Sequence, residues 1–351
     1  MAKKRRSMEA GKMNRVNDLV ARYDPSVAVH YGQFVELAYK MYESAPGNPT
    51  PNPPSPFPAG HKFIAWIQMK DFIVVGGNWT FYGLIAQSTT DANKFILAIR
   101  GTETLEEWWD DLTSVVLVPW EGFGTVGNGF SRIYQTLRVV YPEALGIEAA
   151  ARPLVPTATF AHQVAAAVQH HAANARRPHT VTIAVAGHSL GAALATLYVA
   201  DNFRAKLLST PLLCTFASPR VGDPVFATNF NQIGITSWRI VNELDVVPNL
   251  PFLGFEHIQT LHLYNSASSV RWSLVCWHSL NTYLHLLDSS QPLSADCRWP
   301  PMVVSTAPLQ PRVQPLAATA ALRQIEKEIA LSVPPAGGAT INITVKIGRT
   351  D

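Results

Sequence analysis

The stretch from Val181 to Tyr198 restricts the fold of this chain more than any other. It begins with the apolar run Val181–Ala186, whose β-branched residues are typical of a buried parallel strand. The pentapeptide Gly-His-Ser-Leu-Gly comes next, and an Ala- and Leu-rich run with high helix propensity follows it. Strand, G-x-S-x-G and helix in this order form a nucleophile elbow, which predicts an α/β fold with Ser189 on the turn.

The glycines of this turn have a steric explanation. A Cβ atom at Gly187 or Gly191 would clash with the neighbouring strand or helix, because the turn is tight. The hydroxyl of Ser189 then lies at a helix N-terminus, whose free N–H groups favour a developing oxyanion. Ser189 is therefore the candidate nucleophile.

A serine nucleophile needs a base and an acid, and after an elbow these follow in the order Asp or Glu, then His. Three further strands are expected downstream, at Pro211–Ala217, Thr236–Asn242 and His257–Asn265. Asp245 follows the second of these strands and His278 follows the third. Both residues therefore fit the required order.

Two other residues compete for these roles. Asp223 also follows a strand, and His285 lies two helical turns beyond His278. We expect His278 to be the first residue of a helix, from which a side chain points at the site more readily than from two turns further along. On this reasoning alone, Asp223 and Asp245 both remain candidates for the acid.

At this point the residues resemble a known family, the class 3, or fungal-type, triacylglycerol lipases. The resemblance runs from about Tyr31 to Asp288, most of the chain. It rests on motifs that occur in family order, at Phe95–Thr102, Gly187–Gly191, Ser218–Phe226, Val241–Pro251 and His278–Tyr283. It implies an α/β-hydrolase with a mostly parallel central sheet and helices on both faces.

The resemblance also implies roles for individual residues. Ser189 would be the nucleophile, Asp245 the acid and His278 the base. Asp223, which belongs to a Gly-Asp-Pro motif of the family, would lie outside this triad. The peptide N–H groups of Thr102 and Leu190 would form the oxyanion hole. Two positions depart from the family pattern without removing a catalytic group, because Gly127 and Trp277 stand where members often have His and Asp.

The segment after Thr102 is a candidate lid. Four apolar side chains fall at i, i+3, i+4 and i+7, on one face of a helix, and are Leu105, Trp108, Trp109 and Leu112. Acidic residues occupy the opposite face, which by itself also fits a surface helix packed on the core. The lipase family places an amphipathic lid here, with a tryptophan where Trp108 stands. We therefore expect a lid that covers the site and opens at a lipid–water interface.

Composition narrows the function further. The chain has 351 residues, of which 47% are hydrophobic and 15% charged, as in a protein with a large core. A net charge of +3 is too small to suggest nucleic acid as a partner. The sequence contains no apolar run of about 18 residues, so no membrane span is expected. His, Cys and Asp residues show no metal-ligand spacing, and we expect no metal and no cofactor.

The two ends differ from the centre in composition. Residues 1–23 form a basic tail without the apolar core of a cleavable signal, so we expect a cytoplasmic protein or one exported without such a signal. Residues 24–290 form the expected hydrolase domain, and 291–351 a proline-rich linker and an extension without an assigned role. Cys276 and Cys297 are candidates for a disulfide that would tie the segment carrying His278 to the linker.

Patterning predicts the other elements of the domain. Helices are expected at Asp24–Glu43, Phe130–Tyr141 and Ala161–Arg176, and strands at Phe63–Ile73, Thr80–Ser88 and Phe95–Arg100. The predicted function is hydrolysis of carboxylic esters, first of all triacylglycerols, through an acyl-enzyme. Feruloyl esterases and phospholipases A1 share these motifs and are the alternatives, and a non-catalytic binding protein is the alternative from another class.

Overall fold

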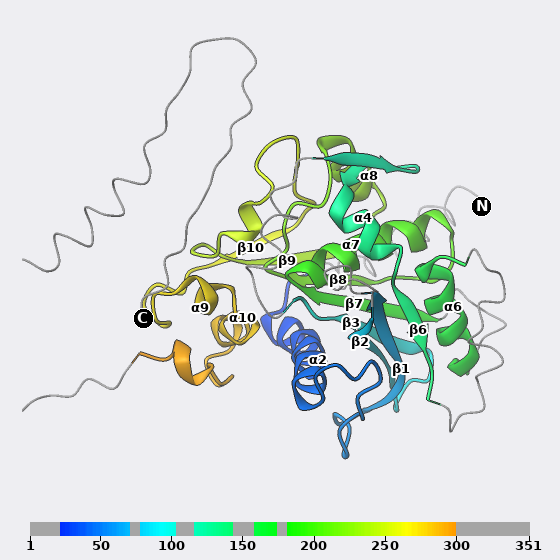
Figure 1. Cartoon of the computed structure of the whole chain (residues 1–351), viewed down its shortest axis with the longest axis horizontal. Helices are drawn as coiled ribbons and strands as arrows, with labels where there is room; N and C mark the ends of the chain where they lie inside the picture. Colours follow the sequence, from blue (N-terminus) through cyan, green and yellow to red (C-terminus); the bar gives the residue numbers. More distant parts are fainter. Residues whose placement is uncertain (1–21, 71–77, 103–115, 143–157, 174–180, 300–351) are drawn as a thin grey trace, which may run out of the picture. The chain divides into compact units, whose positions relative to one another are not determined.

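The computed structural model describes residues 22–70, 78–102, 116–142, 158–173 and 181–299. Within these residues the strands form an eight-stranded sheet in the order β10-β9-β8-β7-β3-β2-β1-β6, and a two-stranded sheet of β4 and β5 (Figure 1). The strands are β1 (His61–Lys70), β2 (Trp79–Ser88), β3 (Lys94–Ile99), β4 (Leu117–Trp120), β5 (Gly124–Gly127), β6 (Arg138–Val140), β7 (Thr182–His188), β8 (Leu212–Phe216), β9 (Thr236–Asn242) and β10 (Leu261–Tyr264).

The larger sheet has a parallel part and an antiparallel part. Strands β3, β7, β8, β9 and β10 pair in parallel, whereas β2, β1 and β6 continue the sheet with antiparallel pairs. Most of β7 and all of β8 are buried, as expected for parallel strands that are covered on both faces. The predicted, mostly parallel central sheet is confirmed.

Helices cover both faces of this sheet. They are α2 (Pro25–Ser44), α4 (Asn128–Tyr134), α6 (Phe160–His171), α7 (Leu190–Arg204), α8 (Pro224–Gln232), α9 (Leu274–His278) and α10 (Leu280–Leu287), with short 3-10 turns η4 (Val247–Asn249) and η5 (Ala295–Cys297). Helices α4, α6 and α7 share one hydrophobic core, and α2 and α10 share the other. Alternate residues of β7 enter the two cores, Ile183 and Val185 on one face and Ala184 and Ala186 on the other.

Three predicted elements need correction. The helix expected at Phe130–Tyr141 ends at Tyr134, and Arg138–Val140 forms β6 instead, because these residues pair with the free edge of β1. The helix expected at Ala161–Arg176 ends at His171, because the backbone becomes extended at Ala172. The last parallel strand is shorter than predicted and begins at Leu261.

The position of His278 also differs from the prediction. It is the last residue of α9 and not the first residue of a helix, because the chain turns out of helical geometry at Ser279 (φ −57°, ψ 131°) before α10 begins. The predicted lid, the tail up to residue 21 and the extension beyond Trp299 lie outside the described residues. The domain boundaries drawn from the sequence therefore stay predictions.

Candidate active site

Ser189 joins β7 to α7 without an intervening loop. Strand β7 ends at His188 and helix α7 begins at Leu190. The backbone of Ser189 has φ 56° and ψ −125°, a conformation that non-glycine residues rarely adopt and that is often found at functional sites. The predicted elbow is therefore present in the described chain.

The flanking glycines make this sharp connection possible. A Cβ atom at Gly187 would collide with the backbone carbonyl of Gly191, the second residue of α7. A Cβ atom at Gly191 would collide with the carbonyls of Ile99 and Arg100 at the end of β3. Because backbone atoms cannot move aside as a flexible side chain can, both positions require glycine.

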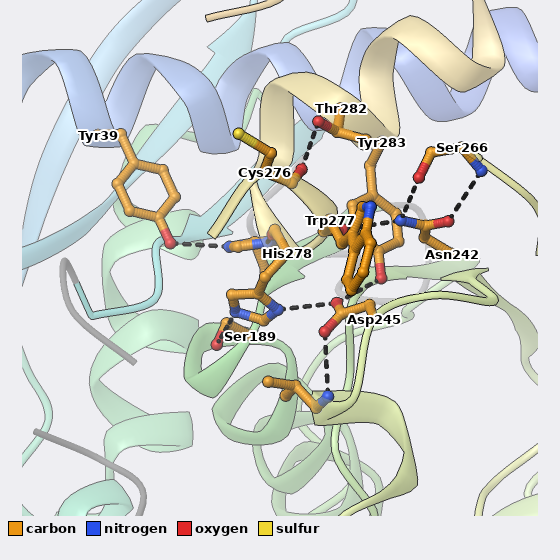
Figure 2. Close-up of polar contacts among 12 residues, drawn as sticks. Tyr39, Ser189, Asn242, Asp245, Ser266, Cys276, Trp277, His278, Thr282 and Tyr283 are labelled. Atoms are coloured by element: carbon orange, nitrogen blue, oxygen red, sulfur yellow. Dashed lines mark hydrogen bonds and ion pairs between the residues drawn. The ribbon is translucent and has the colours of Figure 1, made fainter. Parts of the chain in front are cut away.

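The structure brings the side chains of Ser189, His278 and Asp245 into one hydrogen-bonded line (Figure 2). His278 Nε2 lies 2.8 Å from Ser189 Oγ, and His278 Nδ1 lies 2.8 Å from Asp245 Oδ2. An ionised carboxylate can only accept, so Nδ1 carries the ring proton and Nε2 is free to accept from the serine hydroxyl. All three residues are buried, at 4%, 8% and 2% exposure. This arrangement allows a neutral imidazole to take a proton from Ser189.

Two further donors hold the carboxylate of Asp245. The hydroxyl of Tyr283, in α10, donates to Oδ2 at 2.7 Å (Figure 2). The backbone N–H of Val247, in η4, donates to Oδ1 at 3.0 Å. Burial, together with the negative charge of Asp245, raises the pKa of Tyr283 well above its usual range, so this hydroxyl keeps its proton. A buried carboxylate without such partners would be costly, and these donors stabilise its charged form.

The competing residues lie elsewhere. Asp223 caps the N-terminus of α8, where its carboxylate accepts from the N–H of Phe226 and from the N–H and hydroxyl of Thr125. The Nδ1 atom of His285 lies 2.8 Å from the backbone carbonyl of Gln291, so this ring faces the segment that follows α10. Neither residue joins the line of Ser189, His278 and Asp245.

The two expected oxyanion donors are near the elbow. Leu190 is the first residue of α7, so its N–H belongs to the turn that lacks helical acceptors. Thr102 follows Gly101, at which an added Cβ would lie 2.9 Å from the Cβ of Ser189. The chain therefore passes close to Ser189 just before Thr102. The predicted lid residues Leu105, Trp108, Trp109 and Leu112 lie outside the described residues, and their placement stays a prediction.

Sequence reasoning missed several polar residues of the site. Tyr283 holds Asp245, and His188 and Asn242 hold the backbone around His278. His188 and Tyr283 occur in the motifs that carried the resemblance, but a motif alone does not tell which buried group each one faces. The sequence feature that could have identified these residues is a polar side chain within an otherwise apolar, buried stretch.

A disulfide fixes the segment that carries His278. Cys276 in α9 is bonded to Cys297 in η5, with Cα atoms 5.2 Å apart, so this candidate pair is joined. In the part of the chain that the structure describes, no three His, Cys, Asp or Glu residues are grouped to hold a metal ion. Over the same residues, none of the helices combines the length and hydropathy needed to cross a membrane.

Comparison with known proteins agrees with the motifs. Residues 96–255 match the model of the family described as Lipase (class 3). Phospholipase A1-II 3 of Oryza sativa subsp. indica is 29% identical over 239 residues, which cover 61% of this chain and 54% of that protein. A lipase of Rhizomucor miehei is 41% identical over 107 residues, which cover 28% of this chain and 29% of that protein. The matched region thus spans about half the length of phospholipase A1-II 3, namely 54% of it.

A solved structure is also similar. The Rhizomucor miehei lipase propeptide complex has 23% sequence identity and a TM-score of 0.48, with 68% of each chain covered.

Proposed function

Because residues 96–255 belong to the class 3 lipase family, we propose that this chain is a serine hydrolase of carboxylic esters, with a catalytic domain over residues 24–290. The observation that carries the proposal is the buried line from Ser189 Oγ through the imidazole of His278 to Asp245 Oδ2. Its order, distances and inferred tautomer are those that a neutral imidazole needs to activate a serine.

The proposed reaction has two halves. Ser189 Oγ attacks the ester carbonyl while His278 takes the hydroxyl proton, and Asp245 holds the imidazolium in place. The N–H groups of Thr102 and Leu190 stabilise the oxyanion, each by about 3 kcal/mol. His278 then gives its proton to the departing alcohol, and water, activated by the same ring, releases the carboxylic acid from Ser189.

Apolar residues near the base support a lipid substrate. Trp272, Leu274 and Val275 lie just before His278 and expose 68%, 43% and 69% of their surface. Exposed apolar side chains of this kind favour contact with an aggregated or interfacial lipid. We therefore place triacylglycerols first among the substrates. Phospholipids, cleaved as by a phospholipase A1, are the second candidate, because the relatives from Oryza sativa carry that name.

One panel of substrates separates these candidates. The full chain is assayed on emulsified triolein, phosphatidylcholine vesicles, methyl ferulate and a short p-nitrophenyl ester, with Ser189→Ala as the blank. We expect fastest release of acid from triolein, and a rate that rises once a sparingly soluble ester exceeds its solubility. A preference for phosphatidylcholine would establish the second candidate. A preference for methyl ferulate would overturn the lipid assignment, and failure on every ester would overturn the hydrolase.

A further inference from the structure

Buried side chains hold the end of α9. This helix has only five residues, so the carbonyls of its last residues find no N–H donor within the helix. Three consecutive carbonyls are instead met by side chains from α10, β9 and β7, in the pairs Cys276 O with Thr282 Oγ1 (2.6 Å), Trp277 O with Asn242 Nδ2 (2.9 Å) and His278 O with His188 Nε2 (2.8 Å). Thr282, Asn242 and His188 are all buried, so these bonds are shielded from water.

The bond from His188 fixes the tautomer of that ring. A backbone carbonyl can only accept, so Nε2 of His188 carries the proton and donates to His278. The Nδ1 atom of His188 must then accept, and the hydroxyl of Tyr39, 2.8 Å away, is its donor. The oxygen of Tyr39 in turn accepts from the N–H of Gly101 at 2.7 Å. A directed chain therefore runs from Gly101 through Tyr39 and His188 to the backbone of His278.

The surroundings of His188 keep its ring neutral. Burial, and to a lesser degree the nearby ring of His278, lower the pKa of His188 well below its usual value. The two rings are 4.8 Å apart and tilted by 42°. A neutral ring with the proton on Nε2 can donate to the carbonyl of His278 and accept from the hydroxyl of Tyr39. A second proton, on Nδ1, would point at the hydroxyl proton of Tyr39.

We propose that His188 is a positioning residue, which sets the place of His278 relative to Ser189. This inference rests on the proposed function. His188 is covalently joined to Ser189 at the end of β7, and its Nε2 holds the peptide of His278. One side chain thus links the nucleophile strand to the backbone that carries the base. An error of about 1 Å between reacting groups costs about 100-fold in rate, so this link controls turnover.

Tyr39 extends the same control to the other side of the elbow. Its oxygen holds Gly101, which packs against Ser189 and directly precedes Thr102. Loss of this hydroxyl removes both the donor to His188 and the acceptor for Gly101. Tyr39 therefore positions the segment with the proposed oxyanion donor as well as the ring of His188.

Two amide substitutions each keep one of the two hydrogen bonds of the His188 ring and remove the other. In His188→Gln the side-chain amide reaches the place of Nε2 and can donate to His278 O. In His188→Asn the shorter amide reaches only the place of Nδ1 and can satisfy Tyr39 but not His278. On a short p-nitrophenyl ester we expect kcat to fall about 100-fold for His188→Asn and about tenfold or less for His188→Gln, with KM changed less than about twofold in both.

Controls separate positioning from folding. Tyr39→Phe should lower kcat about tenfold, and His262→Asn, at a ring on β10 that stacks on Tyr23, should leave it unchanged. Melting temperatures and ¹⁵N spectra of the histidine rings are recorded for each variant. In the wild type these spectra should show His188 neutral with its proton on Nε2, a result that does not depend on ester hydrolysis.

The outcomes distinguish the inference from the proposed function. A wild-type protein that hydrolyses no ester overturns the proposed function, whereas the ring spectra still test the tautomer of His188. An active wild type with equal kcat in His188→Asn and His188→Gln overturns the inference. A proton found on Nδ1 of His188, or losses of kcat that follow the melting temperature alone, would overturn it too.

Discussion

Tyr283 and His278 meet at the same carboxylate oxygen. The hydroxyl of Tyr283 donates to Asp245 Oδ2 at 2.7 Å, and Nδ1 of His278 lies 2.8 Å from that same oxygen. Tyr283 is fully buried in α10, the helix that follows the base along the chain. The two donors therefore fix where Oδ2 lies, and through it how the imidazole is turned toward Ser189.

Removing the hydroxyl of Tyr283 should weaken this alignment. In Tyr283→Phe the carboxylate keeps the bonds from Val247 N–H and His278 but loses a hydrogen bond to a charged group, worth about 1.5–3 kcal/mol. We expect kcat on a short p-nitrophenyl ester to fall about tenfold, with KM nearly unchanged. Steady-state kinetics measure this effect. Activity equal to the wild type would show that Oδ2 is held without Tyr283.

Asp245 and Asp223, the two candidates for the acid, should differ in what their replacement by asparagine impairs. Asp245→Asn removes the charge that orients His278, and kcat should fall by about 10⁴ while the melting temperature stays close to the wild type. Asp223→Asn can still cap α8 but loses the carboxylate oxygen that accepts from the Thr125 hydroxyl, so it should lower stability by about 1 kcal/mol with little change in kcat. Kinetics and urea unfolding are measured on both variants. A loss of kcat in Asp223→Asn comparable to that in Asp245→Asn would contradict the assignment.

The disulfide should stabilise the segment of the base. Cys276 and Cys297 are separated by 21 residues, and a link that closes a loop of this size contributes about 3 kcal/mol. Cys276→Ser with Cys297→Ser should therefore lower the melting temperature by about 6–10 °C. A reductant should lower the melting temperature of the wild type by a similar amount. It should leave the melting temperature of the double variant unchanged, since the third cysteine, Cys214, is a buried free thiol. A double variant that still responds to reductant would contradict this source of stability.

Acid should destabilise the fold through His257. Its Nε2 donates to the carbonyl of Pro248, and burial, with the positive charge of Arg239, lowers the pKa of His257 to about 3. In the unfolded chain the pKa is 6.5, so the stabilising contribution is present above pH 6.5 and is lost as the pH falls toward about 3.

A variant isolates this contribution. Between pH 7 and pH 5 the free energy of unfolding of the wild type should fall by about 2 kcal/mol more than that of His257→Gln. Urea unfolding at both pH values measures the difference. Equal losses in the two proteins would mean that His257 takes up its proton as readily when folded as when unfolded.

Local patterning predicted the parallel core well. Strand β9 has the bounds that its apolar pattern predicted, Thr236–Asn242, because a strand buried on both faces is recognisable by its residues alone. The short strand β6 lies within the predicted helix Phe130–Tyr141, because its pairing depends on the edge of β1, which its own three residues do not reveal.

The site was predictable in its parts but not in its bonds. The elbow and the order of Ser189, Asp245 and His278 follow from motif and spacing. The break between α9 and α10 does not, because the carbonyls that end α9 bond to side chains from three other elements. His188 and Tyr39 gain their partners only when β7, α9 and α2 come together.

Covalent labelling of Ser189 tests the central claim most directly. The wild type, Ser189→Ala and His278→Ala are treated with a fluorophosphonate, and the modified residue is located by mass spectrometry of the intact chain and its peptides. We predict a single adduct on Ser189 in the wild type, none at that position in Ser189→Ala, and labelling slowed by about 1,000-fold or more in His278→Ala. An adduct on another residue, no adduct in the wild type, or equal rates with and without His278 would contradict the account.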